Sequence, residues 1–244
     1  LEILEDLPNV ETVVVPIGGG GLISGIATAI KGTDPDVRVV GVQAAGASSV
    51  APSLEKGERI ELESVNTIAD GIATRTVGED SFGVIRERVD EVVTVTDDEI
   101  AVALTQLLER GKTLVEGAGA VPLAALIEGK FDYADGETVV PVLSGGNIDM
   151  NMLTTVIVRG LAATGRYLRI RTVLHDRPGA LEEFVAIVAE MGANIYAIQH
   201  DRTSRDVAMD DAEIEVDLET RGTEHVDELV GALEDAGYAI DVLV

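Results

Sequence analysis

The chain has 244 residues, 46% of them hydrophobic, which is enough for a buried core, yet no apolar run reaches the roughly 18 residues of a membrane span. The absence of cysteine excludes disulfides and thiolate metal sites and favours a reducing cytoplasm. Forty-four acidic residues against eighteen basic ones give a formal net charge of −26, which argues against binding to nucleic acid or to an anionic membrane.

Short apolar runs alternate with helical segments over the first 143 residues. The pattern predicts strands at residues 12–16, 38–43, 91–95 and 138–143, and helices at residues 22–31 and from 96 to about 110. The second helix opens with a capping box, because Thr96 is followed three residues later by Glu99. This alternation predicts an α/β fold with an open, mostly parallel sheet that is covered on both faces.

Four consecutive glycines, residues 18–21, lie between the first strand and the first helix. Such a loop can direct backbone N–H groups and a helix N-terminus at a phosphate. Ile23 and Ser24 stand where the dinucleotide fingerprint needs its last glycine, and no Gly-Lys-Ser/Thr triplet of a P-loop follows. The remaining candidate ligand is a single phosphate monoester, and the alternative is a turn that glycine allows to pack tightly.

A second turn, Ser144-Gly145-Gly146-Asn147, follows the strand predicted at residues 138–143. It can lie near the same crevice as the glycine loop, where the Ser144 hydroxyl could meet a ring nitrogen. The alternative is an ordinary turn, since these residue types favour turns.

The pattern changes at the small residues 162–165. Beyond them we predict strands at 167–174, 194–201, 212–218 and 238–243, and helices at 181–191 and 226–236. The order βαββαβ is that of a ferredoxin-like unit. We therefore expect two domains, residues 1–162 and 166–244.

Four motifs of the first domain resemble the threonine ammonia-lyase and serine racemase family, which belongs to the tryptophan-synthase-like class of pyridoxal-phosphate enzymes. They occupy residues 15–22, 67–71, 115–120 and 144–147, in the family's order. The resemblance implies pyridoxal 5'-phosphate as the cofactor and L-threonine as the substrate, converted to 2-oxobutanoate and ammonia. The alternatives are a serine racemase, a serine or hydroxyaspartate dehydratase, and a non-catalytic amino-acid sensor.

The resemblance also assigns site residues. Ser144 should face the pyridine nitrogen of the cofactor, and the backbone that holds the cofactor phosphate should be that of Gly18, Gly19, Gly20, Gly21 and Leu22. Glu116 and Asp70 lie in family motifs near the site, where each is either a functional acid or a structural acid of a turn or helix start.

Two departures from the family matter. Gln43 stands where the serine racemase branch has a metal-binding glutamate, so we expect no metal site there. None of the four lysines has the Ser-Phe-Lys context of the family's Schiff-base lysine, so we expect no catalytic lysine within this chain. We therefore expect a fragment of a longer protein, inactive by itself.

The second domain resembles the ACT family of amino-acid-sensing domains, through residues 175–181 and 192–195. The resemblance implies an amino-acid effector such as isoleucine or valine, feedback control in isoleucine biosynthesis, and side-by-side pairing into a homo-oligomer, a dimer or tetramer. The candidate effector-binding residues are Gly179, Leu181 and Asn194. The three histidines are scattered, which argues against a metal cluster.

The acidic residues are spread along the whole chain, and only four of the basic residues are lysines. A folded chain of this composition is typical of a salt-rich cytoplasm, where screening removes self-repulsion. The alternative is an ordinary acidic enzyme.

Overall fold

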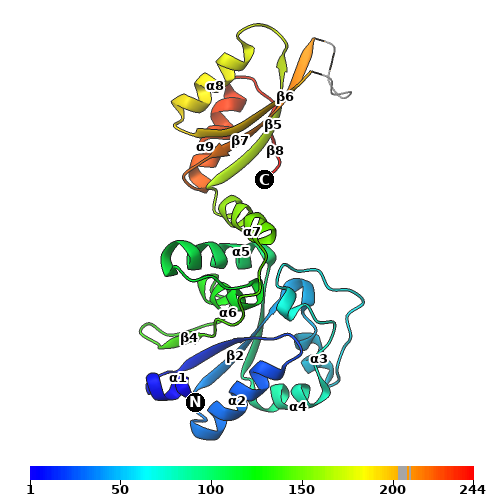
Figure 1. Cartoon of the computed structure of the whole chain (residues 1–244), viewed down its shortest axis with the longest axis vertical. Helices are drawn as coiled ribbons and strands as arrows, with labels where there is room; N and C mark the ends of the chain where they lie inside the picture. The colour runs from blue at the N-terminus through cyan, green and yellow to red at the C-terminus, as the bar shows by residue number, and fades with distance from the viewer. Residues whose placement is uncertain (203–207, 209) are drawn as a thin grey trace. The chain divides into compact units, whose positions relative to one another are not determined.

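The computed structural model describes residues 1–202, 208 and 210–244. They form two compact units, Leu1–Gly160 and Leu161–Val244, each with its own hydrophobic core (Figure 1). Within these described residues, no helix has both the length and the hydrophobicity that crossing a membrane requires.

The first unit is built on a parallel sheet, as the sequence predicts. Its strands are β1 (Thr12–Pro16), β2 (Arg38–Ala44), β3 (Glu91–Val95) and β4 (Val139–Pro141), in the order β3-β2-β1-β4. The predicted fourth strand was too long, because only three residues of it form a strand. β4 lies at the edge of this sheet and ends at Pro141, although the N–H of the next residue, Val142, still donates to the carbonyl of Val14 at 2.9 Å.

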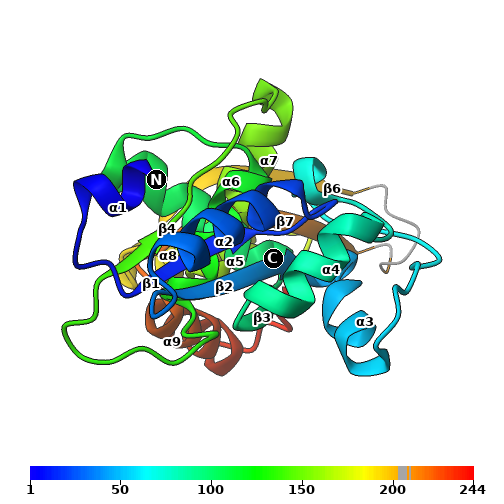
Figure 2. The same ribbon diagram turned by 90° about the horizontal axis from the view of Figure 1, so that it is seen from below.

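Helices cover both faces of this sheet (Figures 1 and 2). On one face, α2 (Gly21–Thr33) and α4 (Glu79–Arg88) pack on Val13 and Val15 of β1. On the other face, α5 (Asp97–Gln106) and α6 (Gly117–Ile127) pack on Val14. Alternate side chains of β1 therefore pack into two different cores, one on each face of the sheet, which explains why the strand has no polar face.

The remaining elements of the first unit are short, apart from the helix that ends it. They are α1 (Glu2–Asp6), η1 (Ala45–Ala47), α3 (Val50–Lys56), η2 (Asp70–Ile72), η3 (Leu107–Gly111) and α7 (Met150–Ala163). The predicted capping box is confirmed, since Thr96 and Glu99 exchange hydrogen bonds of 3.3 and 2.8 Å. The helix predicted to residue 110 changes to a π-helical turn at Leu107.

The path of the chain reverses direction in the sheet between β1 and β4. From β1 the chain runs outward to β2 and β3 through α2 and α4 on one face, and it then returns through α5 and α6 on the other face to reach β4. In open α/β sheets, ligands bind beyond the carboxyl ends of the strands at such a point of reversal.

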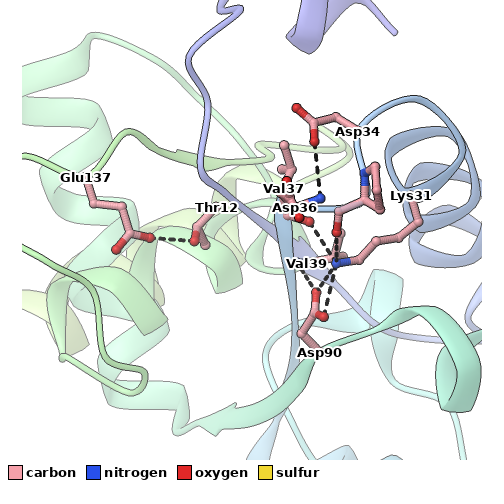
Figure 3. A network of polar contacts seen from close by, with 9 residues as sticks. Thr12, Lys31, Asp34, Asp36, Val37, Val39, Asp90 and Glu137 are labelled. Atoms are coloured by element: carbon pink, nitrogen blue, oxygen red, sulfur yellow. Dashed lines mark hydrogen bonds and ion pairs between the residues drawn. The ribbon is translucent and has the colours of Figure 1, made fainter.

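The opposite, amino edge of the sheet is fixed by polar contacts (Figure 3). Lys31 at the end of α2 donates to the carbonyl of Val37 at 2.9 Å and forms an ion pair with Asp90. Thr12 donates to Glu137 at 2.6 Å, and this hydroxyl is the main cause that lowers the pKa of that carboxyl group. These side chains hold the fold at the edge away from the point where ligands are expected.

The second unit has the predicted order βαββαβ. Its elements are β5 (Tyr167–His175), α8 (Ala180–Glu190), β6 (Asn194–Asp201), β7 (Asp211–Glu219), α9 (Thr223–Asp235) and β8 (Asp241–Val242). The strands form an antiparallel sheet in the order β6-β7-β5-β8.

Both helices of this unit pack on one face of its sheet. Alternate residues of β5 and β7 are buried there, and the Phe184 ring of α8 meets Tyr238 edge-on at 5.3 Å between centroids. The last strand is two residues long instead of the predicted six, and Tyr238 and Ile240, which precede it, pack against the core outside the ladder.

Candidate functional site

The glycine loop leaves the carboxyl end of β1 and turns directly into α2. Gly20, in the left-handed region at φ +91°, precedes the first helical residue. Ile17 N–H is bound to the carbonyl of Val42 at 2.8 Å, and Ser24 N–H to that of Gly20 at 3.0 Å. Between them, the N–H groups of residues 18–23 have no acceptor among the described residues. A run of free N–H groups at a helix N-terminus is suited to an anion.

The space around the loop is open on one side and walled on the other. A Cβ atom on Gly19 or Gly21 would meet nothing within 4 Å. A Cβ on Gly20 would lie 2.6 Å from that of Ser81 in α4, and one on Gly18 would lie 2.9 Å from the Cα of Ile72. α2 carries no acidic residue in its first turn, so its dipole is not neutralised there. The free N–H groups, the open side of the loop and the positive end of the helix dipole thus all fit a phosphate group.

The wall that α4 forms was not predicted from the sequence. Gly78 N–H donates to the carbonyl of Gly19 at 3.0 Å, and Ser24 Oγ donates to the carbonyl of Ser81 at 3.4 Å. The available signal was the pair Glu79-Asp80, which marks a helix start by its charge. The weak amphipathic pattern of α4 gave no support to that signal.

The turn at Ser144 leaves the same edge of the sheet. β4 is the parallel neighbour of β1, with Val14 opposite Pro141, and Ser144 follows three residues after that proline. Ser144 is half-buried. Its carbonyl oxygen packs so closely on Gly119 of α6 that a Cβ there would collide with it. The structure therefore brings the two glycine turns to adjacent strand ends.

The motifs at residues 67–71 and 115–120 lie close to these two glycine turns. A Cβ on Gly117, at the start of α6, would lie 2.7 Å from the carbonyl oxygen of Ile68. Thr67 donates to Asp97 of α5 at 2.7 Å, which fixes the segment before η2. A cavity of about 50 Å³ lies between these elements, with Asp70 and Glu116 in its lining. All four motifs, which are far apart in the sequence, thus meet at the carboxyl edge of the sheet.

Gln43, at the end of β2, is completely buried and both ends of its amide are used. Its Nε2 donates to the carbonyl of Ala47 at 3.1 Å, and its Oε1 accepts from the N–H of Val50 at 2.7 Å. The side chain therefore ties down the loop that follows the strand. A cation would have to displace the amide from Ala47. Among the described residues, no three His, Cys, Asp or Glu side chains gather as metal ligands.

The four lysines are engaged or distant from the glycine loop. Lys31 is bound at the amino edge of the sheet, and Lys130 forms an ion pair with Glu99 at 2.6 Å. Lys112 donates to the carbonyl of Glu109, and Lys56 lies exposed in the last turn of α3. None of them lines the cavity described above.

The predicted effector residues of the second unit do not all meet within one chain. Gly179 and Leu181 line a cavity of about 270 Å³ together with His200 and Arg202. Asn194 donates to Glu219 at 3.1 Å, at the opposite end of the sheet from that cavity. A Cβ on Gly179 would meet nothing within 4 Å, so the backbone there is open to a ligand.

Comparison with known proteins identifies relatives of the chain. A family model described as "Pyridoxal-phosphate dependent enzyme" matches residues 1–145. An L-threonine ammonia-lyase of Geobacter sulfurreducens is 51% identical over 243 residues, which is 100% of this chain. An L-threonine ammonia-lyase of Thermotoga maritima is 46% identical over the same length. The chain spans 60% of the length of each of these relatives.

Solved structures with similar folds cover mainly one part of the chain. The processed form of threonine deaminase isoform 2 from Solanum lycopersicum has a TM-score of 0.59 and 36% identity, and the match covers 64% of this chain and 46% of that one. Maize serine racemase has a TM-score of 0.59 and 39% identity, with 63% and 48% covered.

Proposed function

The chain belongs to the pyridoxal-phosphate dependent enzymes, and on that premise we propose that the natural protein containing it is an L-threonine ammonia-lyase, which converts L-threonine to 2-oxobutanoate and ammonia. The observation that carries this assignment is the extent of the match. Both threonine ammonia-lyases align over the whole chain, including the second unit, at 51% and 46% identity.

In this proposal the backbone of residues 18–22 binds the cofactor phosphate through its free N–H groups. The hydroxyl of Ser144 meets the pyridine nitrogen. When bound, the cofactor would supply electron withdrawal from the substrate carbon, to an extent set by the residue that meets its pyridine nitrogen. Because a neutral hydroxyl does not hold that nitrogen protonated, Ser144 limits the electron withdrawal and favours loss of the substrate's β-hydroxyl group.

The lysine that binds the cofactor covalently comes, in this proposal, from outside residues 1–244. Support comes from the four lysines of the chain, of which Lys31 and Lys130 are held in ion pairs away from the glycine loop. We expect residues 1–244 alone, mixed with pyridoxal phosphate and reduced with borohydride, to retain no stoichiometric cofactor on any lysine. A single lysine modified in full yield, together with turnover of threonine, would contradict this.

Two other functions are alternatives to the deamination of threonine. Serine racemase activity, or dehydration of serine or hydroxyaspartate, is favoured by the 39% identity to maize serine racemase. A non-catalytic amino-acid sensor would use only the second unit. The convergence of four motifs at one strand edge speaks against a sensor, since sensing alone does not need a phosphate cradle.

The deciding experiment uses the whole natural protein. With pyridoxal phosphate it should release 2-oxobutanoate from L-threonine faster than pyruvate from L-serine, and serine should not be racemised at a comparable rate. D-serine formation as the main reaction would favour the racemase alternative. No conversion of any of these amino acids would favour the sensor.

For the second unit we propose an ACT regulatory domain that binds isoleucine or valine and serves isoleucine biosynthesis in the cytoplasm. Its support is the βαββαβ order and the open backbone at Gly179. β6 is an edge strand, so two copies can pair through it in antiparallel fashion. That pairing would bring Asn194 of a second copy toward the cavity at Gly179 and Leu181, and it would make the protein a homo-oligomer.

We also propose that no metal acts at the end of β2. The support is the amide of Gln43, whose two hydrogen bonds already fix the loop at Ala47 and Val50.

A further inference from the structure

We propose that Glu116 is a positioning residue that holds the Ser144 turn in the place from which its hydroxyl can meet the cofactor ring. This inference rests on the function proposed for Ser144 and adds the residue through which that function is maintained. Glu116 is the N-cap residue of α6.

Glu116 exchanges two hydrogen bonds with the turn, one in each direction. Its N–H donates to the carbonyl of Gly145 at 3.3 Å, and its Oε2 accepts from the N–H of Asn147 at 3.1 Å. Among the described residues, these are the hydrogen bonds that link residues 144–147 to chain segments outside 142–149. A turn with no regular structure therefore depends on one residue, Glu116, for its hydrogen bonds to the rest of the unit, one through the backbone and one through the side chain.

The packing around the carboxyl group is equally specific. A Cβ on Gly145, which has φ +74°, would collide with the Glu116 carboxyl group. A Cβ on Gly71 would lie 2.5 Å from Glu116 Oε1. The carboxyl group thus fills the space between η2 and the turn, and the two glycines leave room for it. Glu116 does not cap its own helix with its side chain, which leaves the carboxylate for this contact.

The turn is held from a second side by α6. The carbonyl of Ser144 packs on Gly119, so one end of the turn is fixed by backbone contact and the other by Glu116. Glu116 is the N-cap residue of α6, whose first helical residue is Gly117, and its side chain takes no part in the helix's own hydrogen bonds. Removing the side chain should therefore release the turn without unfolding the helix that supports it.

The test compares Glu116→Ala, Glu116→Gln and Ser144→Ala in the whole natural protein, with Glu128→Ala at the exposed other end of α6 as a matched control. Glu116→Ala should lower kcat about tenfold to a hundredfold while KM and cofactor content change little, because a misplaced group loses transition-state contacts. The absorption band of the bound cofactor should shift as in Ser144→Ala. Glu116→Gln, which keeps an acceptor oxygen, should restore most of kcat.

The double variant separates positioning from an independent effect. If Glu116 acts through Ser144, Glu116→Ala combined with Ser144→Ala should be no slower than Ser144→Ala alone. Multiplied losses would overturn the proposal, as would a Glu116→Gln variant as slow as Glu116→Ala, since the charge itself would then be the cause.

Hydrogen exchange does not depend on activity, so it tests the positioning role of Glu116 separately from the function proposed for Ser144. In Glu116→Ala, hydrogen exchange at the amide of Asn147 should accelerate roughly tenfold or more, because a charge-assisted hydrogen bond is lost. Unchanged exchange would overturn the positioning role. Faster exchange with a normal rate and spectrum in Ser144→Ala would instead overturn the function proposed for Ser144.

Discussion

Gln43 makes a pair of hydrogen bonds that a glutamine can form and a glutamate, its isosteric acid, could not. A glutamine offers a donor to Ala47 and an acceptor to Val50, whereas a carboxylate would repel the carbonyl. Because Gln43 is fully buried, neither partner can turn to water if the side chain is lost.

Gln43→Ala should therefore lower the free energy of unfolding by roughly 2–4 kcal/mol, the cost of two unpaired backbone groups in the interior. Urea unfolding of residues 1–244 followed by circular dichroism measures this. Gln106→Ala, at a half-buried position in the same unit, is the control and should cost much less. Equal losses in the two variants would mean that the Gln43 hydrogen bonds contribute nothing specific.

Asp217 provides a pH-dependent prediction in the second unit. The hydrogen bond from Arg169 is the main cause that lowers its pKa. A carboxylate whose pKa is lower in the folded state stabilises the fold above its unfolded pKa of about 3.9, and this contribution is lost as the pH falls through the folded value. The advantage of wild type over Asp217→Asn should thus be full at pH 7 and shrink below about pH 4. A difference in melting temperature that is independent of pH would contradict this reading.

At the scale of elements, helix α2 and the N-cap position before it provide a matched pair of glycines, Gly25 and Gly20. Gly25 lies exposed in the interior of the helix with open space around the position of a Cβ, so Gly25→Ala should raise stability by roughly 0.5–1 kcal/mol through backbone entropy. Gly20 has φ +91° and faces Ser81, so Gly20→Ala should lower stability by more than about 1 kcal/mol. Thermal unfolding of both variants tests the pair, and two effects of the same sign would refute it.

The regular elements were the part of the fold that the sequence could predict. β1, β2 and β3 are apolar runs between turns, and the Thr96–Glu99 capping box marks a helix start by its own hydrogen bonds. α6 was not predicted because it is apolar all round and contains Pro122, so it has no amphipathic period. The ends of β4 and β8 were misjudged because neighbours in space, not local pattern, decide where an edge strand stops.

For the candidate site, each motif could be found in the sequence, but the contacts between the motifs could not be predicted from it. The placement of Ser144 beyond β4 followed from strand-end reasoning, and the structure puts β4 beside β1. The contact of Glu116 with Gly71 and Gly145 joins three segments that are separated along the chain, and no local pattern encodes it. The grouping of Asn194 with Gly179 failed within one chain for the same reason, since strand direction separates them.

At the scale of the whole molecule, the charge sets the conditions for stability. With a net charge of −26, at least twenty-six carboxylates have no basic side chain of their own to pair with. Their repulsion weakens as the Debye length falls from roughly 10 Å at 0.1 M salt to 3 Å at 1 M. The melting temperature of residues 1–244 should therefore rise with potassium chloride. Sodium chloride at equal ionic strength is the control for a specific ion effect, and a flat or falling trend through molar salt would refute the prediction.

The Phe184–Tyr238 contact has an optical consequence. The chain has no tryptophan and four tyrosines, of which Tyr167, Tyr196 and Tyr238 belong to the second unit and Tyr133 alone to the first. Ultraviolet-excited emission therefore reports mainly on the second unit, and separation of Tyr238 from the Phe184 ring changes the surroundings of one of its emitters. If the glycine loop binds the cofactor as proposed, the absorbance of the cofactor would report on the first unit. Two colours of light could then follow the two units separately in one unlabelled sample, without any engineered probe.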